Sequence, residues 1–217
     1  MKKLDLSVYV LTDAVPALDR THEDIAWAAI QGGASMIQFR DKTMSDRQFA
    51  ETAARILGMA RAAGIPLIVN DRISIAVAIG ADGVHIGRND GDAGEIQRAL
   101  PPQMIFGLSA INYDEALQMD ALRASYLGVG PVFPTASKED ATPPIGIEML
   151  HRICRIAQTP VVAIGGINCA TLPSVFHAGA AGGALISAVT HARDMTVAVR
   201  ELKSIAESGA EFCDDCF

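Results

Sequence analysis

The sequence is poor in aromatic residues, in cysteine and in positive charge. Its 217 residues include one Trp, three Tyr and seven Phe, so the core must be built from aliphatic and small side chains. The formal charge is −7, from 18 basic and 25 acidic residues. We therefore do not expect the broad basic surface that binding to nucleic acid requires. The hydrophobic fraction of 50% argues against a disordered chain.

The four cysteines do not indicate a disulfide framework. Cys154 and Cys169 are isolated, and we expect both to be small core side chains. Cys213 and Cys216 form one C-x-x-C motif in the last five residues, which is weak evidence for zinc because no second pair accompanies it. We assign no function to this motif and expect residues from about 209 to 217 to be a frayed tail.

Neither a signal peptide nor a membrane span is expected. Asp5 follows the N-terminal lysines closely, and no long apolar run comes after it. The stretch Ile156–Ala192 has no Asp, Glu, Lys or Arg over 37 residues, which exceeds the roughly 20 residues of a membrane helix. Pro160, Pro173 and several glycines interrupt it, so we expect buried strands joined by a helix. A cytoplasmic protein without membrane contact is the resulting prediction.

Short apolar runs alternate with amphipathic runs along the whole chain. The predicted strands are Ser7–Leu11, Met36–Phe39, Leu67–Val69, Gly83–His85, Met104–Phe106, Tyr126–Val129, Val161–Ile164 and Ala184–Ile186. Helical patterns begin near Thr21, Ser45, Arg72, Asp92, Asn112, Gly146, Cys169 and Ala192. A strand–helix unit repeated about every 27 residues predicts an α/β fold, a single-domain (β/α)₈ TIM barrel over residues 1–217. An open doubly wound sheet is the alternative, but the glycine-rich loop that it usually carries after the first strand is missing.

In such a barrel the chemistry lies on loops at the carboxyl ends of the strands. Gln38, Arg40 and Lys42 alternate onto one face at the end of the second strand, which suggests an anion site. Asp71 and Asp90 follow the third and fourth strands and suggest Mg²⁺, which typically takes one or two carboxylates plus water and phosphate oxygens. For each carboxylate a turn or helix-capping role is the alternative.

The later loops suggest phosphate binding. Ser109 follows the fifth strand and could bond a phosphate or cap a helix. We expect His85 to be a core or barrel-wall residue and not a ligand. After the sixth strand, a loop with two hydroxyls and a lysine is either a phosphate lid or a plain surface loop. Gly165 and Gly166 after the seventh strand, with Ser187 after the eighth, suggest a phosphate held by backbone N–H groups. We therefore expect a site for two anionic groups.

Five motifs occur together in the order expected of one known family. They are Gln38–Lys42, Val69–Arg72, Asp82–Asp90, Gly128–Lys138 and Ala163–Ile167. Together they resemble thiamine-phosphate synthases, over about residues 8–188. One departure is Ser137, where the family usually has Thr, and either residue supplies a hydroxyl.

The resemblance implies a transferase that joins 4-amino-2-methyl-5-pyrimidinylmethyl diphosphate to a thiazole phosphate and releases diphosphate. It implies that the pyrimidine diphosphate is bound by Gln38, Arg40, Lys42, Asn70, Ser109 and Lys138. It implies that the thiazole phosphate is bound by Thr135, Ser137, Gly165, Gly166, Ile186 and Ser187. Mg²⁺ would be held by Asp71 and Asp90. Phe39, Asp41 and Ala136 belong to the same motifs and are included as substrate-binding residues, and the catalytic set is Arg40, Lys42, Lys138 and Ser109.

Three alternatives stay open at this point. A thiazole tautomerase of the same fold would bind only the thiazole phosphate and would need no Mg²⁺. A non-catalytic thiamine-phosphate-binding protein would not need both carboxylates and all three cations. Another phosphate-binding barrel, such as an isomerase, would require an acid–base pair at the barrel mouth, which the sequence does not suggest. The oligomeric state is not predicted.

Overall fold

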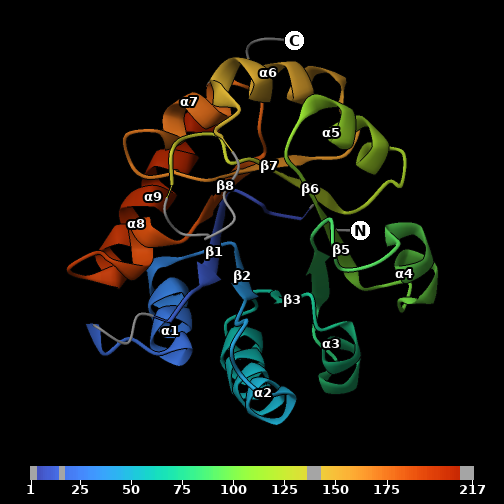
Figure 1. The fold of residues 1–217 in the computed structure, drawn as a ribbon. Coiled ribbons are helices and arrows are strands. Elements are labelled where there is room, and N and C mark those ends of the chain that lie inside the picture. Colours follow the sequence, from blue (N-terminus) through green and yellow to red (C-terminus); the bar gives the residue numbers. More distant parts are fainter. Residues whose placement is uncertain (1–3, 15–17, 136–142, 211–217) are drawn as a thin grey trace.

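The chain folds as a closed barrel of parallel strands surrounded by helices (Figure 1). The computed structural model describes residues 4–14, 18–135 and 143–210. The strands are β1 (Val8–Thr12), β2 (Met36–Phe39), β3 (Leu67–Asn70), β4 (Gly83–Ile86), β5 (Ile105–Ala110), β6 (Tyr126–Val129), β7 (Val161–Ile164) and β8 (Gly182–Leu185). Each strand pairs with the next, and β1 pairs with β8, so the ring has no free edge. The predicted (β/α)₈ barrel is confirmed.

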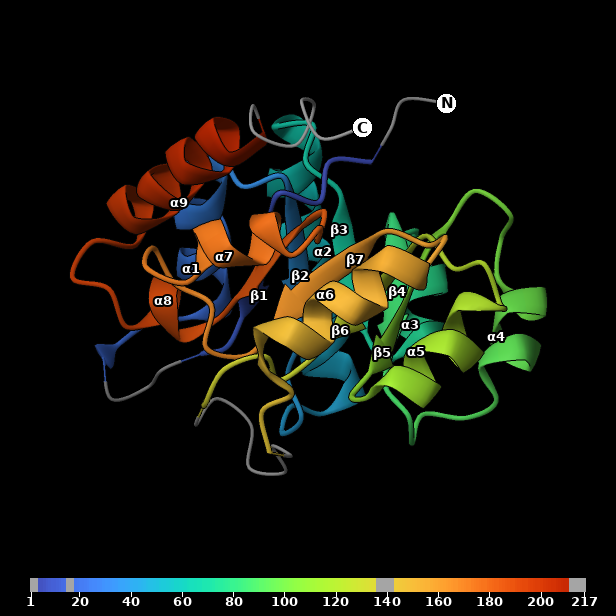
Figure 2. The same ribbon diagram turned by 90° about the horizontal axis from the view of Figure 1, so that it is seen from above.

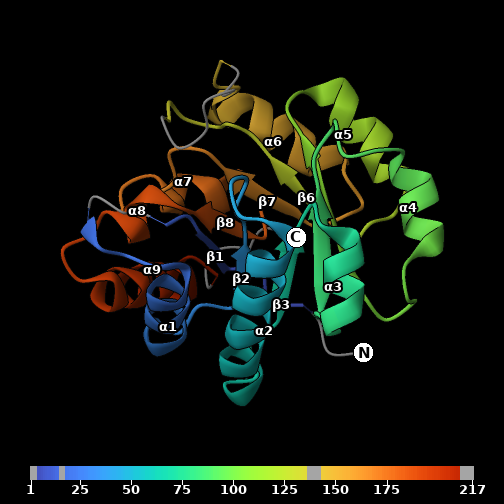
Figure 3. The ribbon, with the colours of Figure 1, turned by 60° about the horizontal axis from the view of Figure 1, so that its bottom comes forward.

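The helices lie outside the ring of strands (Figures 1 and 2). They are α1 (His22–Gly32), α2 (Asp46–Ala62), α3 (Ile73–Ile79), α4 (Ala93–Ala99), α5 (Tyr113–Asp120), α6 (Gly146–Ile156), α7 (Leu172–His177), α8 (Ser187–Thr190) and α9 (Met195–Ala210). Helix α9 packs against α1 and α7, and α2 packs between α1 and α3 (Figure 3). The short α8 was not expected, because Ser187 was predicted to precede a single final helix.

Local sequence determines where several helices begin and end. The Thr21 hydroxyl accepts a hydrogen bond from the Asp24 N–H, and the Asp24 carboxylate accepts one from the Thr21 N–H. Ser45 and Gln48 form the same reciprocal arrangement at the start of α2. Gly33 and Gly80 end α1 and α3 in the left-handed conformation, at φ of 85° and 68°. The helix starts predicted near Thr21 and Ser45 are therefore confirmed.

The core has two layers because side chains alternate along each strand. An inner cluster fills the barrel and consists of Leu6, Tyr9, Leu11, Met36, Ile68, Tyr126, Val162, Ala184 and Ile186. A larger outer cluster lies between strands and helices and includes Ile37, Phe39, Val69, Val84 and Leu127. The inner cluster forms the floor beneath the loops at the carboxyl ends of the strands.

The structure corrects two local predictions. Strand β5 continues to Ala110 instead of ending at Phe106, so Ser109 lies within a strand and not in the loop after it. Gly107 obscured this in the sequence, because glycine is uncommon inside strands. Cys154 packs against the outer core as predicted, but Cys169 is exposed.

The long uncharged stretch from residue 156 to 192 forms β7, α7, β8 and α8, which confirms that it is divided into short elements. Across the described residues, no helix has the length and hydropathy needed to span a bilayer. The predicted tail overlaps the end of α9, which reaches Ala210, and its remainder, with Cys213 and Cys216, lies outside the described residues.

Candidate active site

A cavity of about 230 Å³ opens at the carboxyl ends of the strands. Twelve of the seventeen predicted site residues line it, namely Gln38, Arg40, Lys42, Asn70, Asp71, Asp90, Ser109, Thr135, Gly165, Gly166, Ile186 and Ser187. They come from seven different strand ends, from β2 to β8. The barrel thus brings together residues that are almost 150 positions apart in the sequence.

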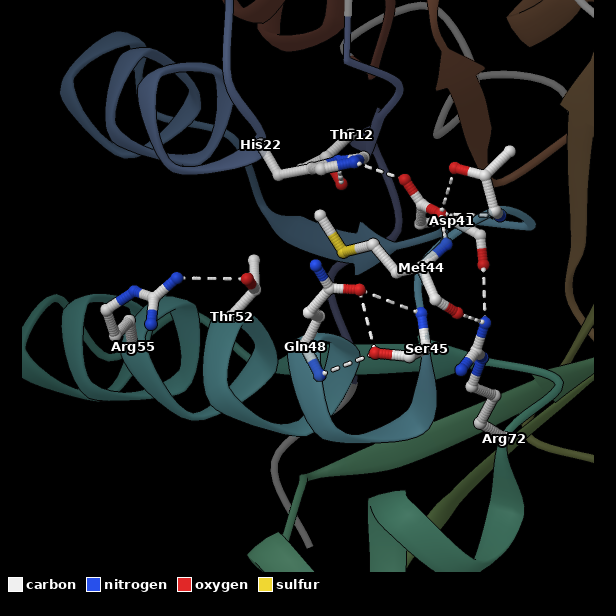
Figure 4. Close-up of polar contacts among 10 residues, drawn as sticks. Thr12, His22, Asp41, Met44, Ser45, Gln48, Thr52, Arg55 and Arg72 are labelled. Carbon is white, nitrogen blue, oxygen red and sulfur yellow. Dashed lines mark hydrogen bonds and ion pairs between the residues drawn. The ribbon is translucent and has the colours of Figure 1, made fainter.

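One wall carries the cations Arg40 and Lys42 on the loop after β2, and Asp41 holds this loop in place. The Asp41 carboxylate accepts hydrogen bonds from the N–H groups of Thr43 and Met44, at 2.7 and 2.6 Å, and contacts His22 Nε2 at 3.0 Å (Figure 4). Burial opposes the charge of Asp41, but these hydrogen bonds outweigh it and lower its pKa to about 2.

Two further contacts tie the same loop to its neighbours. The fully buried Thr12 hydroxyl lies 2.9 Å from His22 Nδ1, which links the loop to the end of β1. Arg72 donates to the Met44 carbonyl at 2.6 Å (Figure 4). It also donates to the Asp46 carboxylate at 2.6 Å. These contacts restrict the backbone from which Arg40 and Lys42 project.

The carboxylates Asp71 and Asp90 meet beside these cations. Lys42 forms an ion pair with Asp71, and the Gly87 N–H donates to Asp90 at 2.6 Å. Burial raises the pKa of Asp71, and its contact with Asp90 raises it further. Burial also disfavours the charge of Asp90, but the hydrogen bonds from Asp71 and Gly87 outweigh that effect and lower its pKa. The contact between the two side chains therefore shifts their pKa values in opposite directions, upward for Asp71 and downward for Asp90.

Bare backbone forms the opposite wall. Gly165 and Gly166 have φ of 92° and 67°, in the left-handed region that favours glycine. A Cβ atom at Gly165 would lie 2.5 Å from Pro131, and one at Gly166 would lie 2.7 Å from Phe133. A side chain at either position would collide with the loop after β6. Both glycines line the cavity, and they do so with backbone atoms alone.

The loop after β6 lies against these glycines. The Val132 N–H donates to the Ile164 carbonyl at 2.8 Å, and the Phe133 N–H donates to the Gly165 carbonyl at 3.0 Å. This pairing brings Thr135 to the cavity. Ala136, Ser137 and Lys138, which the sequence analysis included, lie outside the described residues.

Two predicted substrate-binding residues do not line the cavity. Phe39 is fully buried in the outer core and packs against Phe49, with ring centroids 4.2 Å apart, because its side chain points away from the barrel interior. Asp41 points to His22 and the start of α2 and has the structural role described above. Alternation along β2 separates both from Gln38, Arg40 and Lys42.

The structure adds cavity residues that the sequence analysis did not include as binding residues. These are chiefly Tyr9, His85, Arg88, Asn89 and Tyr126. His85 is a barrel-wall residue, as expected, but it also reaches Ser109 Oγ at 2.8 Å. Tyr9 and Tyr126 could have been found, since each is a polar ring at an inward position of a predicted strand.

The chain matches a family model described as thiamine monophosphate synthase over residues 8–189. It is 46% identical over 202 residues to a thiamine-phosphate synthase of Chloroflexus aurantiacus, covering 93% of each chain. It is also 46% identical over 197 residues to a thiamine-phosphate synthase of Archaeoglobus fulgidus, covering 91% of each.

Among solved structures, a thiamine phosphate pyrophosphorylase from Pyrococcus furiosus superposes with a TM-score of 0.86 at 35% identity. The alignment covers 95% of this chain and 98% of that one. The match thus extends through the barrel and its loops. The chain belongs to the thiamine monophosphate synthase family.

Proposed function

We propose that this member of the thiamine-phosphate synthase family joins 4-amino-2-methyl-5-pyrimidinylmethyl diphosphate to a thiazole phosphate, giving thiamine phosphate and diphosphate. The observation that carries the proposal is one cavity with two different anion-binding walls. Arg40 and Lys42 stand beside two carboxylates on one wall, and the bare peptides of Gly165 and Gly166 form the other. Two phosphorylated substrates would each find a wall of their own.

The diphosphate fits the wall of Arg40, Lys42 and Asn70. The departing group gains negative charge as its bond to the methylene carbon breaks, so fixed cations stabilise that stage more than the ground state. The electron-rich aminopyrimidine stabilises the methylene cation that remains. Ser109, at the same wall, would donate to an oxygen of this substrate.

The residues at Asp71 and Asp90 fit Mg²⁺. Within the described residues no cluster of three or more His, Cys, Asp or Glu side chains could hold a metal, so an all-protein cage is not what these groups form. Two carboxylates in contact with each other are the kind of partial ligand set that Mg²⁺ completes with water and phosphate oxygens. When bound, the ion would neutralise charge on the diphosphate leaving group.

The thiazole phosphate fits the wall of Gly165, Gly166 and Ser187, since peptide N–H groups and a hydroxyl are suitable donors for phosphate. Thr135 would add a donor from the loop after β6. Apolar inner-core residues, such as Val162 and Ala184, line the cavity floor and keep water away from the methylene cation. The thiazole nitrogen, held by its phosphate, is then the nearest nucleophile.

The direct test is to incubate the purified protein with both substrates and to measure thiamine phosphate and diphosphate, with and without EDTA. We expect formation of both products in equal amounts, inhibition by EDTA, and recovery on addition of Mg²⁺. Robust turnover in EDTA would refute the metal assignment, and no product from pure substrates would refute the synthase proposal.

Asp90→Ala tests the carboxylate pair, and Glu207→Ala on the exposed surface of α9 is the matched loss of one charge. We expect Asp90→Ala to lower kcat by at least about 100-fold, as removal of charge stabilisation commonly does. Glu207→Ala should behave like the unmodified protein. An active Asp90→Ala variant would contradict the assignment.

The tautomerase and the non-catalytic binder are not favoured, because the curated relatives named above carry the synthase description. The cytoplasmic location stays a prediction from the sequence.

A further inference from the structure

The Asp41 carboxylate joins the loop after β2 to a different element of the barrel. Its Oδ1 atom accepts hydrogen bonds from within the loop, from the N–H groups of Thr43 and Met44 at 2.7 and 2.6 Å. Its Oδ2 atom lies 3.0 Å from Nε2 of His22, a residue of α1 (Figure 4). One carboxylate oxygen therefore shapes the loop, and the other attaches the loop to α1.

The His22 ring has little freedom to turn. His22 is 2% exposed and is the first residue of α1, directly after the helix cap at Thr21. Its Nδ1 lies 2.9 Å from the hydroxyl of Thr12 on β1. The ring also meets Phe39 edge to face, with centroids 4.9 Å apart. Contacts at both nitrogens and packing on Phe39 therefore hold the ring in one orientation.

His22 Nε2 is the donor in its contact with Asp41. Hydrogen bonds hold the pKa of Asp41 at about 2 against the opposing effect of burial, so at neutral pH the carboxylate is ionised and can only accept. The Thr12 hydroxyl can donate to Nδ1 of a neutral ring or accept from Nδ1 of a charged one. The contact between His22 and Asp41 is therefore the same in both protonation states of the ring.

The two cations of the loop depend on this contact because they flank Asp41 directly. Arg40 and Lys42 both line the cavity, whereas the Asp41 side chain is 13% exposed and points to His22. Without its donor, Oδ2 would gain a hydrogen bond to water only by turning outward. The loop backbone that Asp41 holds would turn with it and carry both cations away from the cavity wall.

The other end of the loop has an anchor of its own. Arg72 donates to the Met44 carbonyl at 2.6 Å, and its guanidinium lies 4.4 Å from the centroid of the Phe49 ring on α2. Loss of the His22 contact should therefore loosen the part of the loop that carries the cations and leave the start of α2 in place.

We propose that His22 is a positioning residue for the diphosphate side of the cavity: by donating to Asp41 it holds the loop after β2, so that the two cations of that loop face the substrate. His22 is not among the described residues that line the cavity, so it acts through Asp41 and not by touching substrate. The role in turnover rests on the proposed function, whereas the hold on the loop is a property of the substrate-free protein.

Two substitutions separate the two hydrogen bonds of His22. In His22→Gln the side-chain amide reaches as far as Nε2 and can still donate to Asp41, whereas in His22→Asn the shorter amide reaches only the position of Nδ1, beside Thr12. Both variants lose the ring that packs on Phe39, so a merely structural role predicts similar effects for the two. His177→Asn, which changes an exposed histidine of α7, is the control.

The first test is amide hydrogen exchange of the full-length protein without substrates, followed by mass spectrometry. We expect peptides from residues 40–45 to exchange at least about 10-fold faster in His22→Asn, because the N–H groups of Thr43 and Met44 lose an ordered acceptor. In His22→Gln and His177→Asn their exchange should stay within about 3-fold of the unmodified protein. Peptides that cover β7 should be unchanged in all three variants.

The second test compares kcat and the two KM values for the proposed reaction. His22→Asn should lower kcat by at least about 10-fold and raise KM for the pyrimidine diphosphate, because displaced cations stabilise the leaving group less. KM for thiazole phosphate should change by less than about 2-fold, because the glycine wall lies on other strands. His22→Gln should keep at least about a third of kcat, and His177→Asn should match the unmodified protein.

A double-mutant cycle tests whether His22 acts through Asp41. In an Asp41→Ala background, His22→Asn and His22→Gln should have the same kcat, since the acceptor that distinguishes them is gone. Should His22→Asn fold poorly, ¹⁵N NMR of the unmodified protein measures the contact directly. We expect a protonated His22 Nε2, and a bare Nε2 would overturn the proposal.

The remaining outcomes also decide the proposal. Equal loop exchange or equal kcat in His22→Asn and His22→Gln would overturn the positioning role, as would additive losses with Asp41→Ala. A rise confined to KM for thiazole phosphate would overturn the assignment to the diphosphate side. If the protein makes no thiamine phosphate at all, the proposed function is wrong, and the exchange result still decides whether His22 holds the loop.

Discussion

A methyl group at position 107 would collide with two buried rings and should destabilise the protein. The added Cβ of Gly107→Ala would lie 2.2 Å from Tyr126 Cζ and 2.6 Å from His85 Nδ1. Relaxed contacts between carbon atoms are about 3.5–4.0 Å, so the Tyr126 ring would have to move by more than about 1 Å. Tyr9 packs edge to face against the same ring and His85 stacks on it, so the ring has little room to move.

Overpacking of a rigid core costs about 1–3 kcal/mol, and this site belongs at the upper end. We expect Gly107→Ala to lower the free energy of unfolding by about 2–3 kcal/mol, which corresponds to a fall in Tm of about 4–12 °C for a chain of this size. Urea unfolding followed by circular dichroism measures the first quantity, and calorimetry measures the second.

Gly58→Ala is the matched control. Gly58 lies inside α2, and no atom lies within 4 Å of the position that an added Cβ would occupy, so alanine should stabilise the helix by about 0.5–1 kcal/mol. The two variants add the same methyl group and should shift stability in opposite directions. A Gly107→Ala variant as stable as the unmodified protein would refute the close packing of the barrel interior.

Three further predictions concern the loops. Asp41→Asn should lower the free energy of unfolding by about 1–2 kcal/mol at pH 7. The difference from the unmodified protein should shrink as the pH falls from about 4 toward 2, because a lowered pKa stabilises the fold only while the folded-state carboxylate is ionised. Urea titrations that show a pH-independent difference would contradict this. Ser45→Ala should cost about 1 kcal/mol in the same assay through loss of the α2 cap, and no loss would mean that the cap is redundant. Gly166→Ala should raise KM for thiazole phosphate by at least about 10-fold. Gly146→Ala should not, because Gly146 is also at positive φ but has open space around it. Equal KM values for the two variants would remove Gly166 from the phosphate site.

Much of the fold could be predicted because its signals are local. The Ser45–Gln48 pair and the glycines that end α1 and α3 act through hydrogen bonds within a few residues, so they are visible in any sequence window. Strand β5 could not be delimited in this way, because Gly107 is favourable there only through its contact with Tyr126, a residue of another strand.

The candidate site, too, could be predicted only in part from the sequence. Alternation from Gln38 to Lys42 and the positions of Asp71 and Asp90 after their strands placed these side chains at the barrel mouth from sequence alone. The same alternation, applied strictly, would have excluded Phe39 and Asp41, whose side chains pack outside the barrel.

The repeated strand–helix unit and the residues at the strand ends can be read from the sequence alone, since both depend on periodicity and on residues near one another in the chain. The contact between Asp71 and Asp90 arises only in the folded barrel. So do the hydrogen bonds that join Gln38, Tyr9, Tyr126, His85 and Ser109 across five strands. Both features depend on distances of about 3 Å between residues remote in sequence, and closure of the ring is what sets those distances.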